Sequence, residues 1–165
     1  MVLRPDDESP TVDPPQLREV APTPTLSEPL AAHRIEGATE LYASAISRLR
    51  AREYDAANQA LLRMIARFPD DTLVGNAHYW RGECAYAKGD FAGARTVWRG
   101  GLALFPQGKK AADSWLKIAF ASERLRDAVA EREAAVILLK QFPDSAAAKM
   151  WRSRAPRVNV KGVSR

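Results

Sequence analysis

The chain has 165 residues, a length typical of one domain, with 46% hydrophobic and 27% charged residues. This composition is that of a globular protein and excludes disorder along the whole chain. A single cysteine, Cys84, excludes an internal disulfide framework and a zinc centre built from several thiolates. No run of 18 apolar residues is present, so the sequence predicts no transmembrane helix.

The first 37 residues differ in character from the rest. Seven of the eleven prolines lie before residue 30, among acidic residues, serines and threonines. Because proline fixes φ and removes a backbone donor, it disfavours both helix and central strand. We therefore expect residues 1–37 to be a Pro-rich, acidic, disordered linker. The apolar segment of a signal peptide is missing after Met1, which predicts a cytoplasmic protein if Met1 is the true start.

Three phenylalanine–proline pairs recur along the rest of the chain at intervals of 37 residues. Small residues also superpose when the sequence is aligned at this period. An internal period of this length is typical of repeat proteins, in which each copy buries its apolar face against the next. The repeat-defining positions are Ala45, Ala57, Pro69, Gly82, Ala94, Pro106, Ala119 and Pro143.

Each copy shows apolar residues at three- and four-residue spacing, which predicts two helices per copy. Polar turns separate the two helices, and in the second turn Gly89 suits a left-handed helix end while Asp90 is expected to cap the next helix. The third turn has Arg126 instead of a glycine. The predicted helix pairs are 38–51 with 54–67, 73–88 with 91–104, and 110–125 with 127–141, followed by a capping helix at 145–154.

The sequence thus predicts an all-α fold, an α-solenoid of three helix pairs plus a C-terminal capping helix. The predicted domain spans 38–155, with repeats at about 38–71, 72–108 and 109–145 and the cap at 145–154. A basic, flexible tail is expected at 156–165. Two neighbouring glycines inside a predicted helix, Gly100 and Gly101, cost helix stability and indicate a kink or a close helix approach.

The small, aromatic and proline positions resemble those of the tetratricopeptide repeat. More specifically, the stretch Asn76–Glu83, together with Tyr86–Phe91, is similar to the central repeat of the Tol-Pal accessory family CpoB (YbgF). The similarity extends over about 38–155. It implies a tetratricopeptide-repeat solenoid, a periplasmic location, and a non-enzymatic scaffold that coordinates envelope constriction during cell division. TolA or other envelope-division proteins are the partners it implies, and the oligomeric state stays open.

In such repeats the first helix of each pair lines a concave face that binds proteins or peptides. Aromatic residues there offer contact area at low entropy cost, and an asparagine can bond the backbone of an extended peptide. The alternative is that Tyr79, Trp80 and Phe120 belong to the core between repeats, as expected for Trp98. The predicted partner-binding residues are Tyr42, Ile46, Asn76, Tyr79, Glu83, Tyr86, Asp113 and Phe120.

Motifs for catalysis or for metal and cofactor binding are missing from the sequence. It contains no His-Glu-x-x-His pattern, no Ser/His/Asp order and no glycine-rich phosphate loop. We expect no enzyme, no metal, no cofactor and no small-molecule substrate. Cys84 falls among small and aromatic residues of a helix, where a free cysteine usually serves as a small buried hydrophobe.

The last seventeen residues, 149–165, hold six basic residues and no acidic one. Such a segment is either a solvated tail or a contact for nucleic acid or another anionic surface. Beside the scaffold, two alternative functions stay open, the first from the related repeat type and the second from the basic tail. One is a tetratricopeptide-repeat lipoprotein of the outer-membrane protein assembly type, and the other is an adaptor that uses its basic tail on an anionic surface.

Overall fold

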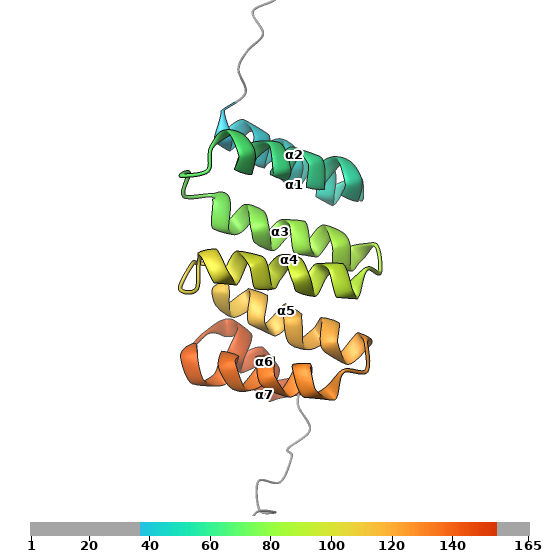
Figure 1. Cartoon of the computed structure of the whole chain (residues 1–165), viewed down its shortest axis with the longest axis vertical. Helices are drawn as coiled ribbons and strands as arrows, with labels where there is room; N and C mark the ends of the chain where they lie inside the picture. Colours follow the sequence, from blue (N-terminus) through green and yellow to red (C-terminus); the bar gives the residue numbers. More distant parts are fainter. Residues whose placement is uncertain (1–36, 155–165) are drawn as a thin grey trace, which may run out of the picture. The chain divides into compact units, whose positions relative to one another are not determined.

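A computed structural model describes residues 37–154, which form seven α-helices and no strand (Figure 1). The predicted linker, apart from Gly37, and the predicted basic tail lie outside the described residues. The predicted helix limits agree with those of the structure to within one residue. The helices are α1 (Ala38–Arg50), α2 (Tyr54–Arg67), α3 (Val74–Ala87), α4 (Phe91–Leu104), α5 (Ala111–Arg124), α6 (Ala128–Gln141) and α7 (Ala146–Arg154).

The helices pack in pairs that follow the chain. Helix α1 pairs with α2, α3 with α4, and α5 with α6, and each pair packs against the next through α2 and α3 or α4 and α5. Helix α7 packs against α5 and α6 at the end of the stack (Figure 1). The described part of the chain is therefore an all-α, solenoid-like repeat of three helix pairs with a capping helix, as the sequence predicts.

The three phenylalanine–proline pairs end the second helix of each repeat in the same way. Phe68, Phe105 and Phe142 are the C-terminal caps, with φ of −134°, −130° and −130° and ψ of 59°, 64° and 50°. A following proline disfavours the helical region at the residue before it, so the chain must turn there. The period of 37 residues thus corresponds to one helix pair and its exit turn.

The turn inside each helix pair uses a left-handed residue at the same repeat position. Arg52, Gly89 and Arg126 have φ of 63°, 84° and 58°. Glycine adopts this conformation without steric cost, whereas a residue with a Cβ atom is strained there. The carboxylates of Asp90 and Asp127 then accept hydrogen bonds from the backbone N–H groups of the next helix, as predicted for Asp90.

Small residues allow the helices to approach closely at the repeat-defining positions. Ala45, Ala57, Ala94 and Ala119 are fully buried. A Cβ atom on Gly82 would lie 2.2 Å from Nε1 of Trp98, so only glycine leaves room for this indole.

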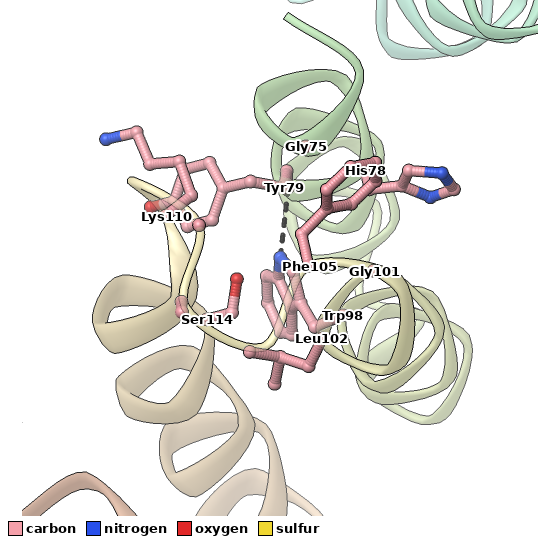
Figure 2. Close-up of a pocket in the computed structure, with 11 residues that line it drawn as sticks. Gly75, His78, Tyr79, Trp98, Gly101, Leu102, Phe105, Lys110 and Ser114 are labelled. Atoms are coloured by element: carbon pink, nitrogen blue, oxygen red, sulfur yellow. Dashed lines mark hydrogen bonds between the residues drawn. The ribbon is translucent and has the colours of Figure 1, made fainter. Parts of the chain in front are cut away.

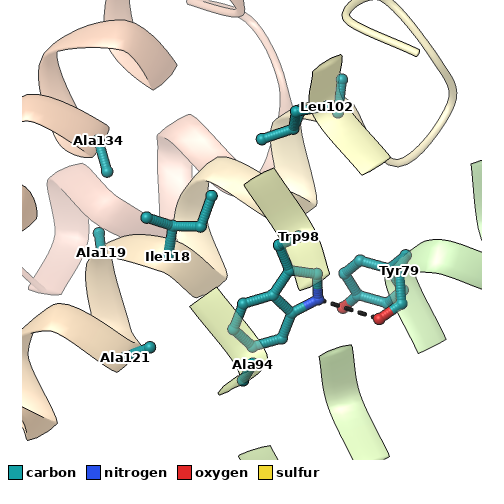
Figure 3. Close-up of a cluster of buried hydrophobic side chains, with 9 residues drawn as sticks. Tyr79, Ala94, Trp98, Leu102, Ile118, Ala119, Ala121 and Ala134 are labelled. Carbon is teal, nitrogen blue, oxygen red and sulfur yellow. Dashed lines mark hydrogen bonds between the residues drawn. The ribbon is translucent and has the colours of Figure 1, made fainter. Parts of the chain in front are cut away.

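Trp98 lies at the centre of the largest buried cluster (Figure 3). Its Nε1 donates a hydrogen bond of 3.0 Å to the backbone carbonyl of Tyr79, and its side chain is 1% exposed. The prediction that Trp98 belongs to the core is confirmed.

The two neighbouring glycines of α4 have different surroundings. A Cβ atom on Gly101 would lie 2.8 Å from Cβ of His78, whereas one on Gly100 would meet nothing within 4 Å. Gly101 therefore marks a close approach of α3 and α4, and Gly100 faces open space.

Candidate protein-binding face

The eight predicted partner-binding residues all lie on the first helices of the three pairs, α1, α3 and α5. Seven of them keep part of their surface exposed. Tyr79 is the exception at 8% exposure, and it belongs to the buried cluster around Trp98. We call the surface formed by the other seven the first-helix face; its residues are Tyr42, Ile46, Asn76, Glu83, Tyr86, Asp113 and Phe120.

Three side chains spaced 37 residues apart form hydrogen bonds to the preceding first helix. Two of them lie on the first helices α3 and α5, and the third lies on the capping helix α7. The three donors occupy the same repeat position, whereas the acceptors differ in chemistry and in position. The sequence-based prediction did not include Lys117 or Arg154 in this face. Their spacing of one and two repeat periods from Trp80 is the sequence signal that could have identified them. The bonds join Trp80 Nε1 to the Tyr42 hydroxyl at 2.7 Å, Lys117 Nζ to Glu83 Oε2 at 2.7 Å, and Arg154 Nη2 to Glu123 Oε2 at 2.8 Å.

Two lysines from the third repeat lie over tyrosine rings of the second repeat. Lys110 Nζ is 5.0 Å from the ring centre of Tyr79, and Lys117 Nζ is 5.6 Å from that of Tyr86. These distances are within the range of cation–π attraction. Figure 2 shows the Lys110 side chain beside the Tyr79 ring. The lysine therefore covers Tyr79, and burial, followed by the charges of Glu83 and Asp113, raises the pKa of this phenol.

Glu83 lies at the centre of the first-helix face with one carboxylate oxygen paired and one unpaired. Its Oε2 accepts from Lys117, whereas its buried Oε1 has no hydrogen-bond partner among the described residues. A buried acceptor without a donor costs free energy. This oxygen therefore keeps an unused capacity to accept a hydrogen bond.

Asn76 begins the first-helix face of the second repeat. Its side chain is partly exposed, and no residue in 37–154 forms a hydrogen bond with its amide. An asparagine amide offers two donors and an acceptor, which match the N–H and C=O groups of an extended peptide. This side chain is therefore available to a partner.

A cavity of about 20 Å³ lies behind Tyr79, between α3, α4 and α5 (Figure 2). Its lining includes Phe105, Lys110 and the buried Ser114. This volume is enough for about one water molecule, so the cavity is too small for an organic ligand.

Neither Cys84 nor His78 is activated by its surroundings. Cys84 is buried, and burial, with a smaller contribution from Glu83, raises the pKa of its thiol to about 11. A thiol of this kind is a weak nucleophile at neutral pH. Burial, followed by the charge of Arg81, lowers the pKa of His78. Within residues 37–154, no three histidine, cysteine, aspartate or glutamate side chains are grouped closely enough to hold a metal ion.

Comparison with known proteins agrees with this architecture. Residues 42–109 match the family described as tetratricopeptide repeat. The chain therefore carries a tetratricopeptide-repeat domain, a class of protein-interaction module. No helix among the described residues combines the length and apolar character needed to cross a bilayer.

Two proteins of Pseudomonas putida, both named Cell division coordinator CpoB, are similar to part of this chain. Each is 37% identical over 49 residues, which are 30% of this chain and 18% of the relative. The chain thus matches less than a fifth of the length of these relatives. The domain resembles CpoB within this stretch.

Proposed function

We propose that the domain binds a protein partner on its first-helix face and serves as a periplasmic scaffold of the Tol-Pal system that coordinates envelope constriction during cell division. The first-helix face carries the binding part of this proposal. It extends over three consecutive first helices and offers both partly exposed aromatic rings and an unbonded amide at Asn76. The similarity to proteins named Cell division coordinator CpoB supports the cellular role.

An extended segment suits this face better than a compact ligand. The bonds of Trp80 and Lys117 hold neighbouring first helices together and that of Arg154 ties the capping helix to α5, which keeps the face in one arrangement before a partner arrives. A preorganised surface binds with a smaller loss of entropy. The absence of a large cavity behind Tyr79 leaves surface contact as the mode of binding at this position.

The proposed partner is TolA, and isothermal titration calorimetry of the purified full chain with TolA from the same genome tests it. Ile46→Asp places a charge in the apolar part of the face, and Asn76→Ala removes the free amide. We expect each change to weaken binding at least about tenfold, the loss typical of an important interface residue. Tyr79 and Tyr86 are poorer probes because both rings pack against core residues.

A matched control is Val129→Asp, which places the same charge on α6 at a side chain that is 80% exposed. This variant should bind TolA as the unaltered chain does. If TolA binds equally well to all three variants, the first-helix face is not the binding surface. If TolA does not bind the unaltered chain, the Tol-Pal role is refuted.

A further inference from the structure

A second recess lies on another side of the same domain. It is a cleft of about 240 Å³ lined by residues of α2, α3 and the start of α4. Arg81 of α3 contributes to its lining and lies two positions before Glu83, a rotation of about 200° that places the two side chains on roughly opposite sides of the helix. The cleft is therefore distinct from the first-helix face, and its size suits a side chain or a chain end.

Arg81 is the unusual group in this cleft. Its Nε donates a hydrogen bond of 3.1 Å to Oδ1 of Asn58, and the side chain is half-buried. No carboxylate in residues 37–154 lies within ion-pair distance of its guanidinium, and no described residue accepts a bond from its terminal nitrogens. Burial lowers the pKa of this guanidinium from its ordinary value. A charge withdrawn from water is stabilised by an opposite charge, so the partly buried guanidinium of Arg81 offers a favourable contact to an anion.

The corresponding contact between helices, 37 residues later in the sequence, shows how the charge of an arginine is compensated. There, Arg95 occupies the position that corresponds to Asn58, and its Nη1 donates to Oδ2 of Asp127 at 2.6 Å and to Oγ of Ser122 at 3.3 Å. The position that corresponds to Arg81 is the fully buried Ile118. The arginine of the later contact is thus paired within the chain, whereas at the earlier one Asp90 stands at the position of Asp127 but no described carboxylate lies within ion-pair distance of Arg81.

The other charges of the cleft limit the ligand to one negative charge. Lys88 is already paired with Asp55 at 2.5 Å. Asp90, which corresponds to Asp127, accepts a hydrogen bond from the backbone N–H of Gly93. Asp90 also lines the cleft and has no ion pair among the described residues, so it would repel a doubly charged phosphate more strongly than a singly charged carboxylate. A carboxylate carries the single charge that Arg81 lacks, and its two oxygens match the planar fork of a guanidinium.

We propose that the cleft between α2, α3 and α4 binds a carboxylate of a protein segment, with Arg81 as its main ligand and Asn58 holding the guanidinium in place. The carboxylate is supplied by an acidic side chain or by the C-terminus of the segment. This site goes beyond the proposed binding on the first-helix face and does not depend on it.

The test is an NMR titration of the ¹⁵N-labelled full chain in which the Nε–Hε signal of Arg81 is followed. The probes are N-acetylglutamate N-methylamide, which offers a side-chain carboxylate, and N-acetylglycine, which offers a terminal one. N-acetylglutamine N-methylamide is the neutral control, and inorganic phosphate is the competing anion. We expect saturable shifts with at least one carboxylate, with a Kd on the order of millimolar as for a single charged contact. The carboxylate that binds more tightly identifies the source.

Variants separate this site from a general effect of charge. Arg81→Gln should abolish the saturable shifts of neighbouring backbone signals, whereas Arg95→Gln, which removes the already paired arginine, should leave them unchanged. Asn58→Ala should weaken binding at least about threefold and provides a second measure if Arg81→Gln does not fold. The proposal is overturned if neither carboxylate gives a saturable shift, if the neutral control gives the same shift, or if the Arg81 and Asn58 variants bind unchanged. Tighter binding of phosphate than of both carboxylates overturns the assignment of the ligand. The calorimetric experiment with TolA and the first-helix variants tests the other proposal, so the failure of one proposal can be distinguished from the failure of the other.

Discussion

Replacing Gly82 with alanine should strongly destabilise the domain, although the same change normally stabilises a helix. The added Cβ would lie 2.2 Å from Nε1 and 2.4 Å from Cε2 of Trp98, far inside van der Waals contact. Trp98 cannot simply rotate away, because it is 1% exposed and its Nε1 is bonded to the carbonyl of Tyr79. The indole or helix α3 must therefore move as a whole.

The size of the effect follows from three contributions. Overpacking of a well-filled core costs about 1–3 kcal/mol. Loss of the hydrogen bond from Trp98 leaves a buried donor unpaired, at a cost of about 1–3 kcal/mol. The gain in helix propensity from glycine to alanine offsets about 1 kcal/mol. We expect Gly82→Ala to lower the free energy of unfolding by about 3 kcal/mol and the Tm by roughly 10 °C.

Urea unfolding followed by circular dichroism measures this change, with Gly100→Ala as the matched control. Gly100 is exposed in α4, and a Cβ atom there would meet nothing within 4 Å. This control should raise stability by about 0.5–1 kcal/mol. In a Trp98→Leu background, which removes the two indole atoms nearest to the new Cβ, the cost of Gly82→Ala should fall. A cost that is the same in both backgrounds, or a Gly82→Ala variant as stable as Gly100→Ala, refutes the packing argument.

Arg126→Gly should stabilise the domain by up to about 1 kcal/mol in urea unfolding, because it removes the left-handed strain of a residue with a Cβ atom. Gly89→Ala at the matching turn should destabilise the domain by about 1 kcal/mol. Changes of the opposite sign would contradict the assignment of strain to these turns. Burial raises the pKa of the Cys84 thiol to about 11. The thiol should therefore react with Ellman's reagent at pH 8 at least about a hundredfold more slowly in the folded chain than in the urea-unfolded chain. Equal rates would exclude a buried thiol. Burial, followed by the charge of Arg81, lowers the pKa of His78 in the folded state from an ordinary value of 6.5, so its contribution to stability is present above pH 6.5 and is lost as the pH falls through the lowered pKa. Urea unfolding at pH 7 and pH 5 should show this loss, and His78→Gln should reduce it; an unchanged difference in the variant would exclude His78 as its source.

The repeat architecture was predictable because its signals are local. Phe–Pro pairs end helices through steric effects between neighbouring residues, and Asp90 caps a helix through a bond to Gly93 three residues on. Three copies of these signals at one period predicted the helix limits to within one residue. The need for a small residue at Gly82 also followed from the period, although its partner, Trp98, did not.

The candidate site was predictable only in part. The period indicates which residues occupy the first helices, but not how much of each side chain remains exposed. The repeat position of Tyr79 predicts that it lies on the first-helix face, but Lys110 of the next repeat covers its ring. Lys117 was overlooked because its role depends on its distance from Glu83, 34 residues earlier.

Arg81 and Arg95 show most clearly what the sequence determines and what the tertiary structure decides. Local interactions along the chain were enough to place both residues on helices, since capping, proline steric effects and apolar spacing act over a few residues. Whether each arginine has a carboxylate partner depends on contacts between elements that are distant in sequence. The tertiary structure brings Asp127 to Arg95, 32 residues away, and brings only Asn58 to Arg81. Charge compensation is a property of distances in space, so the unmatched cation of the cleft could be recognised only after the helices were packed.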